Sequence, residues 1–156
     1  MRLTLLVVGK TTDTRLVSLI EDYRQRLTHY LPFEIVVLPD LKNAKSLTEE
    51  QVKTAEGDAI LRFLTPSMDV ILLDEHGREY RSVEFADFLQ RKMTSGKDLT
   101  LVIGGPYGFS PAVYARANGK LSLSQMTFSH QMIRLMAIEQ IYRAMTILRG
   151  EPYHHE

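Results

Sequence analysis

The stretch Leu99-Thr-Leu-Val-Ile-Gly-Gly-Pro-Tyr-Gly108 decides the fold class, because an apolar run passes directly into a glycine-rich loop. A continuous apolar run of this length is typical of a strand buried on both faces of a parallel sheet. The glycines that follow let the backbone approach a ligand closely, although a tight turn would need them as well. Since α/β proteins bind small ligands at the carboxyl ends of their strands, we expect a ligand site here.

Apolar runs at Leu3–Val8, Phe33–Leu38 and 70–73 predict three earlier strands, and 121–123 predicts a last short one. A turn is expected at 74–77, where the sequence is Asp-Glu-His-Gly. Helices are predicted between the strands. The first begins with a cap at Thr12 or Asp13 and stops at Pro32, and the second begins with a capping box of Thr48 and Gln51. The third begins with a cap at Ser82 and ends at Gly96, and a short fourth begins with Ser110 followed by Pro111. Ser129 is the expected cap of a final helix over about 131–149.

Because strands and helices alternate, the predicted class is α/β, with a mostly parallel sheet covered by helices on both faces. The chain has 156 residues, which fits a single domain spanning 1–156. Its 19 Lys and Arg residues balance 19 Asp and Glu residues, so no overall field draws it to nucleic acid or membranes. With no cysteine and no apolar run long enough for a signal peptide or a membrane span, we expect a soluble cytoplasmic protein.

The predicted final helix is apolar on nearly every side, and such a helix must be buried all round. In a domain this small the sheet covers one side of it, so we expect a second copy of the chain to cover the other. A helix buried at the centre of a monomer is the alternative. The apolar residues are Met132, Ile133, Leu135, Met136, Ala137, Ile138, Ile141, Tyr142, Ala144, Met145, Ile147 and Leu148.

Two pairs of polar residues interrupt this apolar helix. His130 and Arg134 lie four residues apart on one side, and Glu139 and Arg143 lie four apart on nearly the opposite side. The second pair is either a simple ion pair or part of a dimer cleft, where unsolvated charges need partners.

Tyr153 and His154 follow Pro152 at the end of the chain. They belong either to a disordered end or to a segment that stacks on or hydrogen-bonds a nucleobase. The chain has no G-x-G-x-x-G and no P-loop sequence, so a dinucleotide-dependent oxidoreductase is disfavoured. It also has no Cys/His cluster and no serine elbow, so neither a metal site nor serine hydrolysis is expected.

Several separate motifs occur in order and together resemble one known family. They are Ile103-Gly-Gly-Pro-x-Gly108, Leu121-Ser-x-Ser-x-Met-Thr-Phe-x-His130, Arg134, Glu139-Gln-Ile-Tyr-Arg-Ala144 and the terminal Arg-Gly-Glu-Pro-Tyr-His. The chain resembles the ribosomal RNA large subunit methyltransferase H family, a small member of the SPOUT class. The resemblance covers the whole chain and is densest after residue 99.

This resemblance implies a homodimeric enzyme that uses S-adenosylmethionine to methylate N3 of a pseudouridine in 23S ribosomal RNA. It implies an α/β sheet whose C-terminal part forms a deep trefoil knot that holds the cofactor. The neutral overall charge favours the assembled large subunit or the 70S ribosome as the substrate, because phosphate contacts supply most affinity for naked RNA. A non-catalytic dimeric module that binds RNA or the ribosome is the alternative.

The resemblance also assigns cofactor positions, and the variety of their side chains suggests that the backbone does the binding. The family commonly has a proline where this chain has Ser129, a departure that we expect to alter local stiffness. The implied cofactor-binding residues are Leu73, Gly104, Gly105, Leu123, Ser124, Gln125, Met126, Thr127 and Phe128.

The acceptor nitrogen must lose a proton before it becomes a good nucleophile, so a base or an anion-stabilising group is needed. We expect His154 to approach the nucleobase, assisted by Tyr153, with Arg143 or Arg134 holding phosphate or the developing anion. The predicted catalytic residues are His154, Tyr153 and Arg143. The predicted RNA contacts are His130, Arg134, Arg143 and His154.

Overall fold

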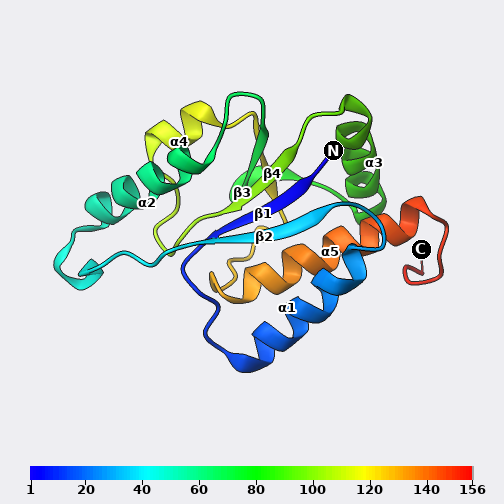
Figure 1. The fold of residues 1–156 in the computed structure, drawn as a ribbon, viewed down its shortest axis with the longest axis horizontal. Helices are drawn as coiled ribbons and strands as arrows, with labels where there is room; N and C mark the ends of the chain where they lie inside the picture. The colour runs from blue at the N-terminus through cyan, green and yellow to red at the C-terminus, as the bar shows by residue number, and fades with distance from the viewer. Residues whose placement is uncertain (156) are drawn as a thin grey trace.

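The computed structural model describes residues 1–155 as one five-stranded sheet with helices on both faces (Figure 1). Every strand pair is parallel, which confirms the predicted α/β class. In chain order the elements are β1 (Leu3–Val8), α1 (Thr14–Leu27), β2 (Phe33–Leu38), the 3-10 helix η1 (Ala44–Ser46), α2 (Glu49–Phe63), β3 (Asp69–Glu79), α3 (Ser82–Ser95), β4 (Leu99–Ile103), α4 (Pro111–Arg116), β5 (Gly119–Ser122) and α5 (Met132–Leu148).

The strands lie in the order β2-β1-β4-β3-β5, and every residue of β1 and β4 is buried. Alternate residues of β1 enter two cores: Leu3 and Leu5 pack on the side of α1, α3 and α5, while Leu6 and Val8 pack on the side of α2 and α4. Figure 1 shows α2 and α4 on one side of the sheet and α1 and α5 on the other. Burial on both faces explains why the central strands have unbroken apolar sequences.

The turn expected at 74–77 is wrong, because β3 continues to Glu79. Its pairing with β5 contains an irregularity in which Leu73 and Arg78 both face Leu121. The residues between them form a bulge beside the main cavity of the molecule. A Cβ on Gly77 would lie 2.6 Å from the Leu121 nitrogen, so close backbone approach requires this glycine.

Most helix starts agree with the sequence prediction. Asp13 caps α1, the capping box of Thr48 and Gln51 begins α2, and Ser110 caps α4. The predicted cap at Ser82 is wrong, because Arg81 is the N-cap of α3. Ser82 is instead the first helical residue, and its hydroxyl donates a hydrogen bond to Gln140 of α5.

Two boundaries near the C-terminus also differ from the prediction. β5 covers Gly119–Ser122 instead of 121–123, and α5 begins at Met132 with Gln131 as its N-cap. Ser129 is not the cap residue, although its hydroxyl accepts a hydrogen bond from the Met132 nitrogen. The trefoil knot stays a prediction, because strand pairing does not define how the chain passes through itself.

α5 lies between α1 and α3 against one face of the sheet, and a single chain buries one side of it. The buried side includes Leu135, Ile138, Ile141 and Met145. On the other side an apolar stripe of Met132, Met136 and Ile147 stays exposed or half-buried. Full burial of α5 therefore needs a covering that this chain does not supply. Among residues 1–155, none of the helices combines the length and apolar character that a membrane crossing requires.

Candidate functional site

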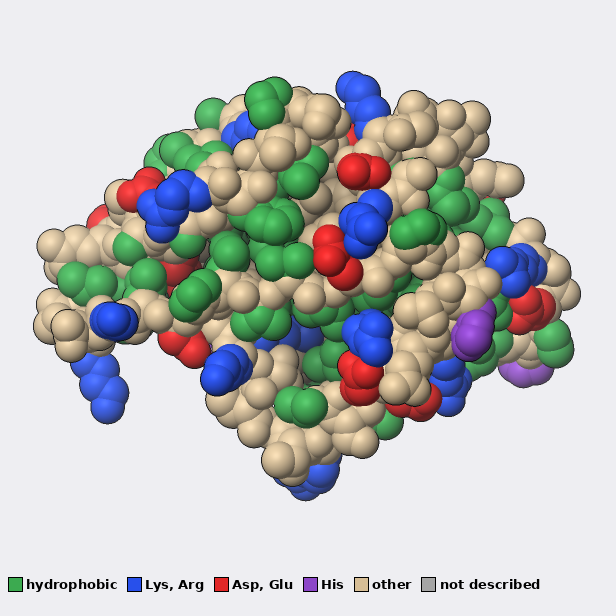
Figure 2. Space-filling model, in the orientation of Figure 1, with side chains coloured by type: hydrophobic (Ala, Val, Ile, Leu, Met, Phe, Trp, Pro, Cys, Tyr) green, Lys and Arg blue, Asp and Glu red, His purple; other side chains and the backbone are tan. Residues whose placement is uncertain are grey.

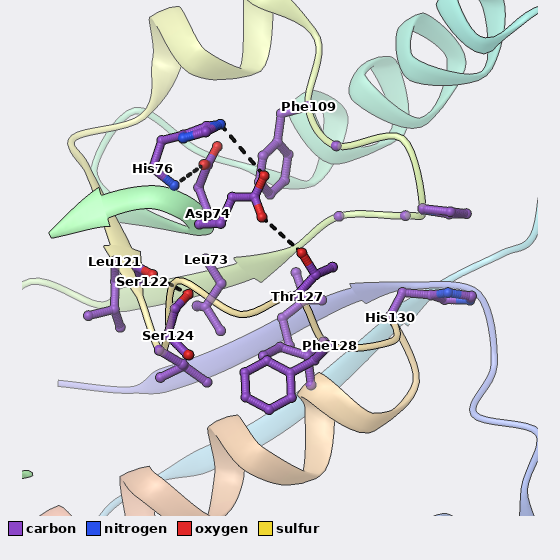
Figure 3. A pocket seen from close by; sticks show the side chains of 18 of the residues that line it. Leu73, Asp74, His76, Phe109, Leu121, Ser122, Ser124, Thr127, Phe128 and His130 are labelled. Atoms are coloured by element: carbon purple, nitrogen blue, oxygen red, sulfur yellow. Dashed lines mark hydrogen bonds and ion pairs between the residues drawn. The ribbon is translucent and has the colours of Figure 1, made fainter. Parts of the chain in front are cut away.

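A cavity of about 560 Å³ opens beside the bulge of β3 and the carboxyl end of β4 (Figure 3). Its walls are formed by 73–76 at the bulge of β3, by the glycine loop 103–109, by most of the connection from β5 to α5, and by Tyr114 and Ile133. The size falls in the range that binds small molecules and cofactors. The position is the one predicted from the strand and glycine loop at 99–108.

The predicted cofactor residues converge on this cavity. Leu73 lines it from the start of the β3 bulge, and Gly104 and Gly105 line it from the loop after β4. From the connection before α5 the lining residues include Leu123, Ser124, Met126, Thr127 and Phe128. Gln125 is exposed and does not line the cavity.

The glycine loop is packed too closely for larger side chains at two positions. A Cβ on Gly104 would lie 3.0 Å from the ring of Phe109, which itself lines the cavity. A Cβ on Gly105 would lie 2.5 Å from Oε2 of Glu56. The loop therefore presents bare backbone to the cavity and rests on the Glu56 carboxylate.

Glu56 of α2 is a functional candidate that the sequence prediction missed. Its side chain is 7% exposed, and its Oε1 atom has no hydrogen-bond partner. Burial, with a smaller contribution from Asp40, raises the pKa of this carboxyl group above its ordinary value. A buried, unpaired carboxylate under a ligand loop is unusual, because most buried polar groups are hydrogen-bonded.

The bulge of β3 gives the cavity a polar wall. The Thr127 hydroxyl donates a hydrogen bond to Oε2 of Glu75 at 3.1 Å (Figure 3). The backbone nitrogen of His76 donates to Oδ1 of Asp74 at 2.8 Å. The Tyr114 hydroxyl donates to Oδ2 of Asp74. The Glu75 contact ties the bulge to the connection that follows β5.

The charges in this wall are set by burial and hydrogen bonds. Burial alone would raise the pKa of Asp74, but the hydrogen bonds from Tyr114 and His76 outweigh it and lower the pKa. Burial and the bond to Asp74 raise the pKa of Tyr114 to about 12. Near neutral pH the wall therefore combines an ionised Asp74 with a protonated Tyr114. Within 1–155, no cluster of three or more His, Asp or Glu side chains is arranged to hold a metal ion.

His130 and Arg134, both predicted RNA contacts, have different surroundings. His130 is half-buried and lines the cavity. Arg134 is 2% exposed, and its guanidinium donates to the carbonyl oxygens of Val8 and Gly9, each at 2.7 Å, and to the Thr11 hydroxyl at 3.0 Å. Burial lowers the pKa of Arg134 from its ordinary value. This guanidinium holds the start of α5 to the end of β1 and does not face solvent.

The three predicted catalytic residues lie together at the other end of α5. Nη1 of Arg143 lies 3.0 Å from Nδ1 of His154, and Nη2 donates to Oε1 of Glu139 at 2.6 Å. The Tyr153 hydroxyl donates to the same Glu139 oxygen at 3.0 Å and lies 3.0 Å from the Tyr23 hydroxyl of α1. We call Glu139, Arg143, Tyr153 and His154 the tail cluster.

The cavity and the tail cluster are separated within one chain. The cavity reaches Ile133 at the start of α5, whereas the first predicted catalytic residue of the tail cluster is Arg143, and the others follow the end of the helix. Ten helical residues between these positions span about 15 Å, at ~1.5 Å per residue. Figure 1 shows the segment after Leu148 turning back beside this end of α5.

Comparison with known proteins gives a consistent result along the whole chain. A family model described as "Predicted SPOUT methyltransferase" matches residues 1–154. Proteins named "Ribosomal RNA large subunit methyltransferase H" from Bacteroides thetaiotaomicron, Parabacteroides distasonis and Phocaeicola vulgatus are 58%, 57% and 56% identical to it over 157 residues. Each alignment covers 100% of this chain and 100% of the relative.

Proposed function

The chain belongs to the SPOUT methyltransferase family, and we propose that it methylates N3 of a pseudouridine in 23S ribosomal RNA with S-adenosylmethionine as donor. The observation that carries this proposal is the cavity beside the bulge of β3 and the end of β4. Its walls contain nearly all the positions at which the family resemblance implies donor binding. A ribosomal RNA substrate in turn places the enzyme in the cytoplasm.

The lining residues fit this donor. Leu73, Leu123 and Phe128 supply apolar surface for an adenine ring and a methionine chain. The glycine loop supplies backbone that no side chain covers. Asp74 and Glu75 place negative charge beside a ligand that carries a positive sulfonium and a positive ammonium group.

The proposed mechanism divides the work between donor and protein. When bound, the donor supplies a methyl group on a positively charged sulfur, which needs no further activation. The glycine loop and residues 123–128 fix the direction of that methyl group, so that the acceptor nitrogen attacks in line. Arg143, Tyr153 and His154 supply hydrogen bonds and positive charge that stabilise the anion formed when the imide nitrogen loses its proton.

We propose that each complete site contains two copies of the chain. Because the tail cluster lies at the opposite end of α5 from the cavity, it cannot approach a donor held by its own chain. Antiparallel packing of two α5 helices about a two-fold axis would bring each tail to the other copy's cavity. The half-buried apolar stripe of α5, which includes Met136, offers the surface for this contact.

The charge distribution supports an assembled substrate. Figure 2 shows Lys and Arg side chains interspersed with Asp and Glu on the visible face, without a large basic patch. Non-specific affinity for RNA depends on such patches, so we propose recognition of the large subunit or the 70S ribosome by shape as well as charge. The RNA contacts then belong to His130, Arg143 and His154, while Arg134 holds α5 in place.

The direct test uses labelled S-adenosylmethionine and ribosomes that lack the modification. We expect saturable donor binding by calorimetry, and transfer of label to one pseudouridine of 23S ribosomal RNA, located by nuclease mapping. Donor binding without transfer to ribosomes would contradict the proposed reaction. Absence of donor binding would instead identify a non-catalytic ribosome-binding module.

The cavity itself is tested by Gly104→Val. A valine at this position presses on Phe109 and narrows the space for the donor, so donor affinity is expected to fall by about tenfold or more. Thr100→Val is the matched control, because it is nearly isosteric and lies in β4, the strand before the glycine loop, away from the cavity. Equal donor affinities for the two variants would show that the donor does not bind in this cavity.

A further inference from the structure

We infer that His154 acts in the proposed reaction as a neutral hydrogen-bond donor through Nε2–H, held in that form by Arg143, and that Glu139 is the positioning residue for Arg143. The inference rests on the proposed function for its substrate. The protonation state and tautomer of His154 are inferred from the contacts within the tail cluster alone.

The contact between Arg143 and His154 fixes the position of the ring proton. Nη1 of Arg143 and Nδ1 of His154 are 3.0 Å apart. A guanidinium has five N–H donors, no acceptor, and stays protonated in proteins. Nδ1 must therefore accept this hydrogen bond with its lone pair. A neutral ring with a lone pair on Nδ1 carries its proton on Nε2.

Glu139 holds Arg143 in the orientation that this contact needs. Its Oε1 accepts from Nη2 of Arg143 at 2.6 Å and from the Tyr153 hydroxyl at 3.0 Å, and its Oε2 accepts from Gln140 at 3.0 Å. The side chains of Arg143 and Glu139 are 25% and 18% exposed. Arg143 also lies over the Tyr153 ring, with its Cζ atom 4.8 Å from the centroid. The guanidinium is thus fixed on several sides.

The titratable and charged groups of the tail cluster are linked to one another and to α1. Arg143 contacts the His154 ring and Glu139, and Tyr153 contacts Glu139, Tyr23 and the ring of Tyr142. Arg26 of α1 lies over the other side of this group, 5.5 Å from the Tyr142 ring centroid. Burial, together with Tyr23 and Glu139, raises the pKa of Tyr153, so its hydroxyl stays a donor.

This form of His154 suits anion stabilisation better than proton abstraction. When N3 of the base loses its proton to water, negative charge spreads onto the two neighbouring carbonyl oxygens. An Nε2–H group can donate to such an oxygen but cannot take the N3 proton at that same nitrogen. The N3 lone pair then forms the new bond to the methyl carbon, and the carbon–sulfur bond breaks with its electrons left on sulfur.

The form of the ring can be measured without activity, by ¹⁵N NMR of the histidine-labelled protein. His154→Gln identifies the His154 signals by their loss, and His155→Gln, which changes an exposed neighbour, leaves them in place. At pH ~7.5 we expect an unprotonated Nδ1 and a protonated Nε2. Glu139→Gln is expected to shift part of the population to the other tautomer. A protonated Nδ1 in the unmodified protein would overturn the inference.

The catalytic role is tested by single-turnover rates of His154→Gln and His154→Ala. Glutamine keeps a donor but no base, so we expect its rate within about tenfold of the unmodified enzyme, and alanine to lose about 100-fold or more. The unmodified rate should rise about tenfold per pH unit from pH ~6 to ~8, following loss of the N3 proton to solvent. Equal loss in both variants, or a rate that levels off at neutral pH, would establish a base and overturn the inference. An unmodified enzyme without any transfer would defeat the proposed function instead, and the NMR result would still decide the tautomer.

Discussion

At the scale of single residues, two buried charged side chains organise the carboxyl edge of the sheet. Arg134 of α5 and Glu56 of α2 are 2% and 7% exposed, and they approach this edge from opposite faces. Arg134 is satisfied by carbonyl and hydroxyl oxygens, whereas one oxygen of Glu56 has no partner. The first therefore stabilises the site, and the second stores an unfavourable interaction beneath the glycine loop.

Arg134→Met is expected to destabilise the protein by about 3 kcal/mol, because it leaves the carbonyl groups of Val8 and Gly9 without their buried donors. Chemical denaturation measures the change. Arg62→Met on the exposed side of α2 is the control and should stay within about 0.5 kcal/mol of the unmodified protein. Matching losses for the two variants would show that Arg134 has no structural role.

Glu56→Gln is expected to stabilise the protein at neutral pH by about 1–2 kcal/mol. Folding raises the pKa of Glu56. Its protonated form therefore contributes to the free energy of unfolding at pH values below the ordinary glutamate pKa, and this contribution is lost as pH rises through the pKa of the folded protein. The advantage of glutamine should therefore disappear near pH 4, a trend that urea denaturation at several pH values measures. Asp58→Asn, on the exposed side of the same helix, should show no such trend.

The positions that the sequence assigned to the donor line the cavity, except for Gln125, but the sequence did not predict the environment of Arg134 and Glu56. The spacing of His130 and Arg134 defines a shared side of a helix, but it does not say whether that side faces solvent or the end of β1. The position of Glu56 in α2 likewise gives no sign of Gly105, which follows it by 49 positions and meets it only in the folded protein.

At the scale of elements, the bulge of β3 and the connection from β5 to α5 together form the outer wall of the cavity. The sequence Asp74-Glu-His-Gly77 is typical of a turn, and this local preference gave the wrong prediction. Parallel pairing with β5 instead extends the strand to Glu79 on both sides of the bulge. Tertiary pairing overrides turn preference here, so local sequence could not reveal the wall.

Glu75→Ala is expected to loosen the connection 123–131, because it removes the acceptor for the Thr127 hydroxyl. Hydrogen exchange followed by mass spectrometry should show faster exchange in that segment with little change in β1 or β4. Glu79→Ala, an exposed carboxylate of the same strand, is the control. Unchanged exchange in both variants would mean that Glu75 does not order the wall.

At the scale of the whole molecule, the parallel sheet follows from the unbroken apolar strands, and the site follows from the glycine loop at its edge. The separation of the cavity from the tail cluster required the structure, because motif order along a chain does not give distance in space. In the proposed function, the same separation makes a second copy of the chain part of the site. The apolar character of α5, visible in the sequence, is what this arrangement explains.

Met136→Glu places a charge on the half-buried stripe of α5 and should convert a dimer into monomers, with loss of methyl transfer. Sedimentation velocity measures the association, and circular dichroism checks that the monomer remains folded. Thr54→Glu, exposed on α2 at the other face of the sheet, should leave the dimer intact. A folded Met136→Glu variant that still sediments as a dimer would exclude α5 from the interface.

The most direct test of the shared site is to combine two impaired variants, Gly104→Val in one copy and His154→Ala in the other, by joint refolding, and to measure transfer at a donor concentration too low for Gly104→Val to bind. Each mixed dimer would contain one unaltered cavity facing one unaltered tail. Random pairing should then restore about a quarter of the unmodified methyl transfer to ribosomes. A mixture as inactive as either variant alone, with mixed dimers present by native mass spectrometry, would contradict a site built from two chains.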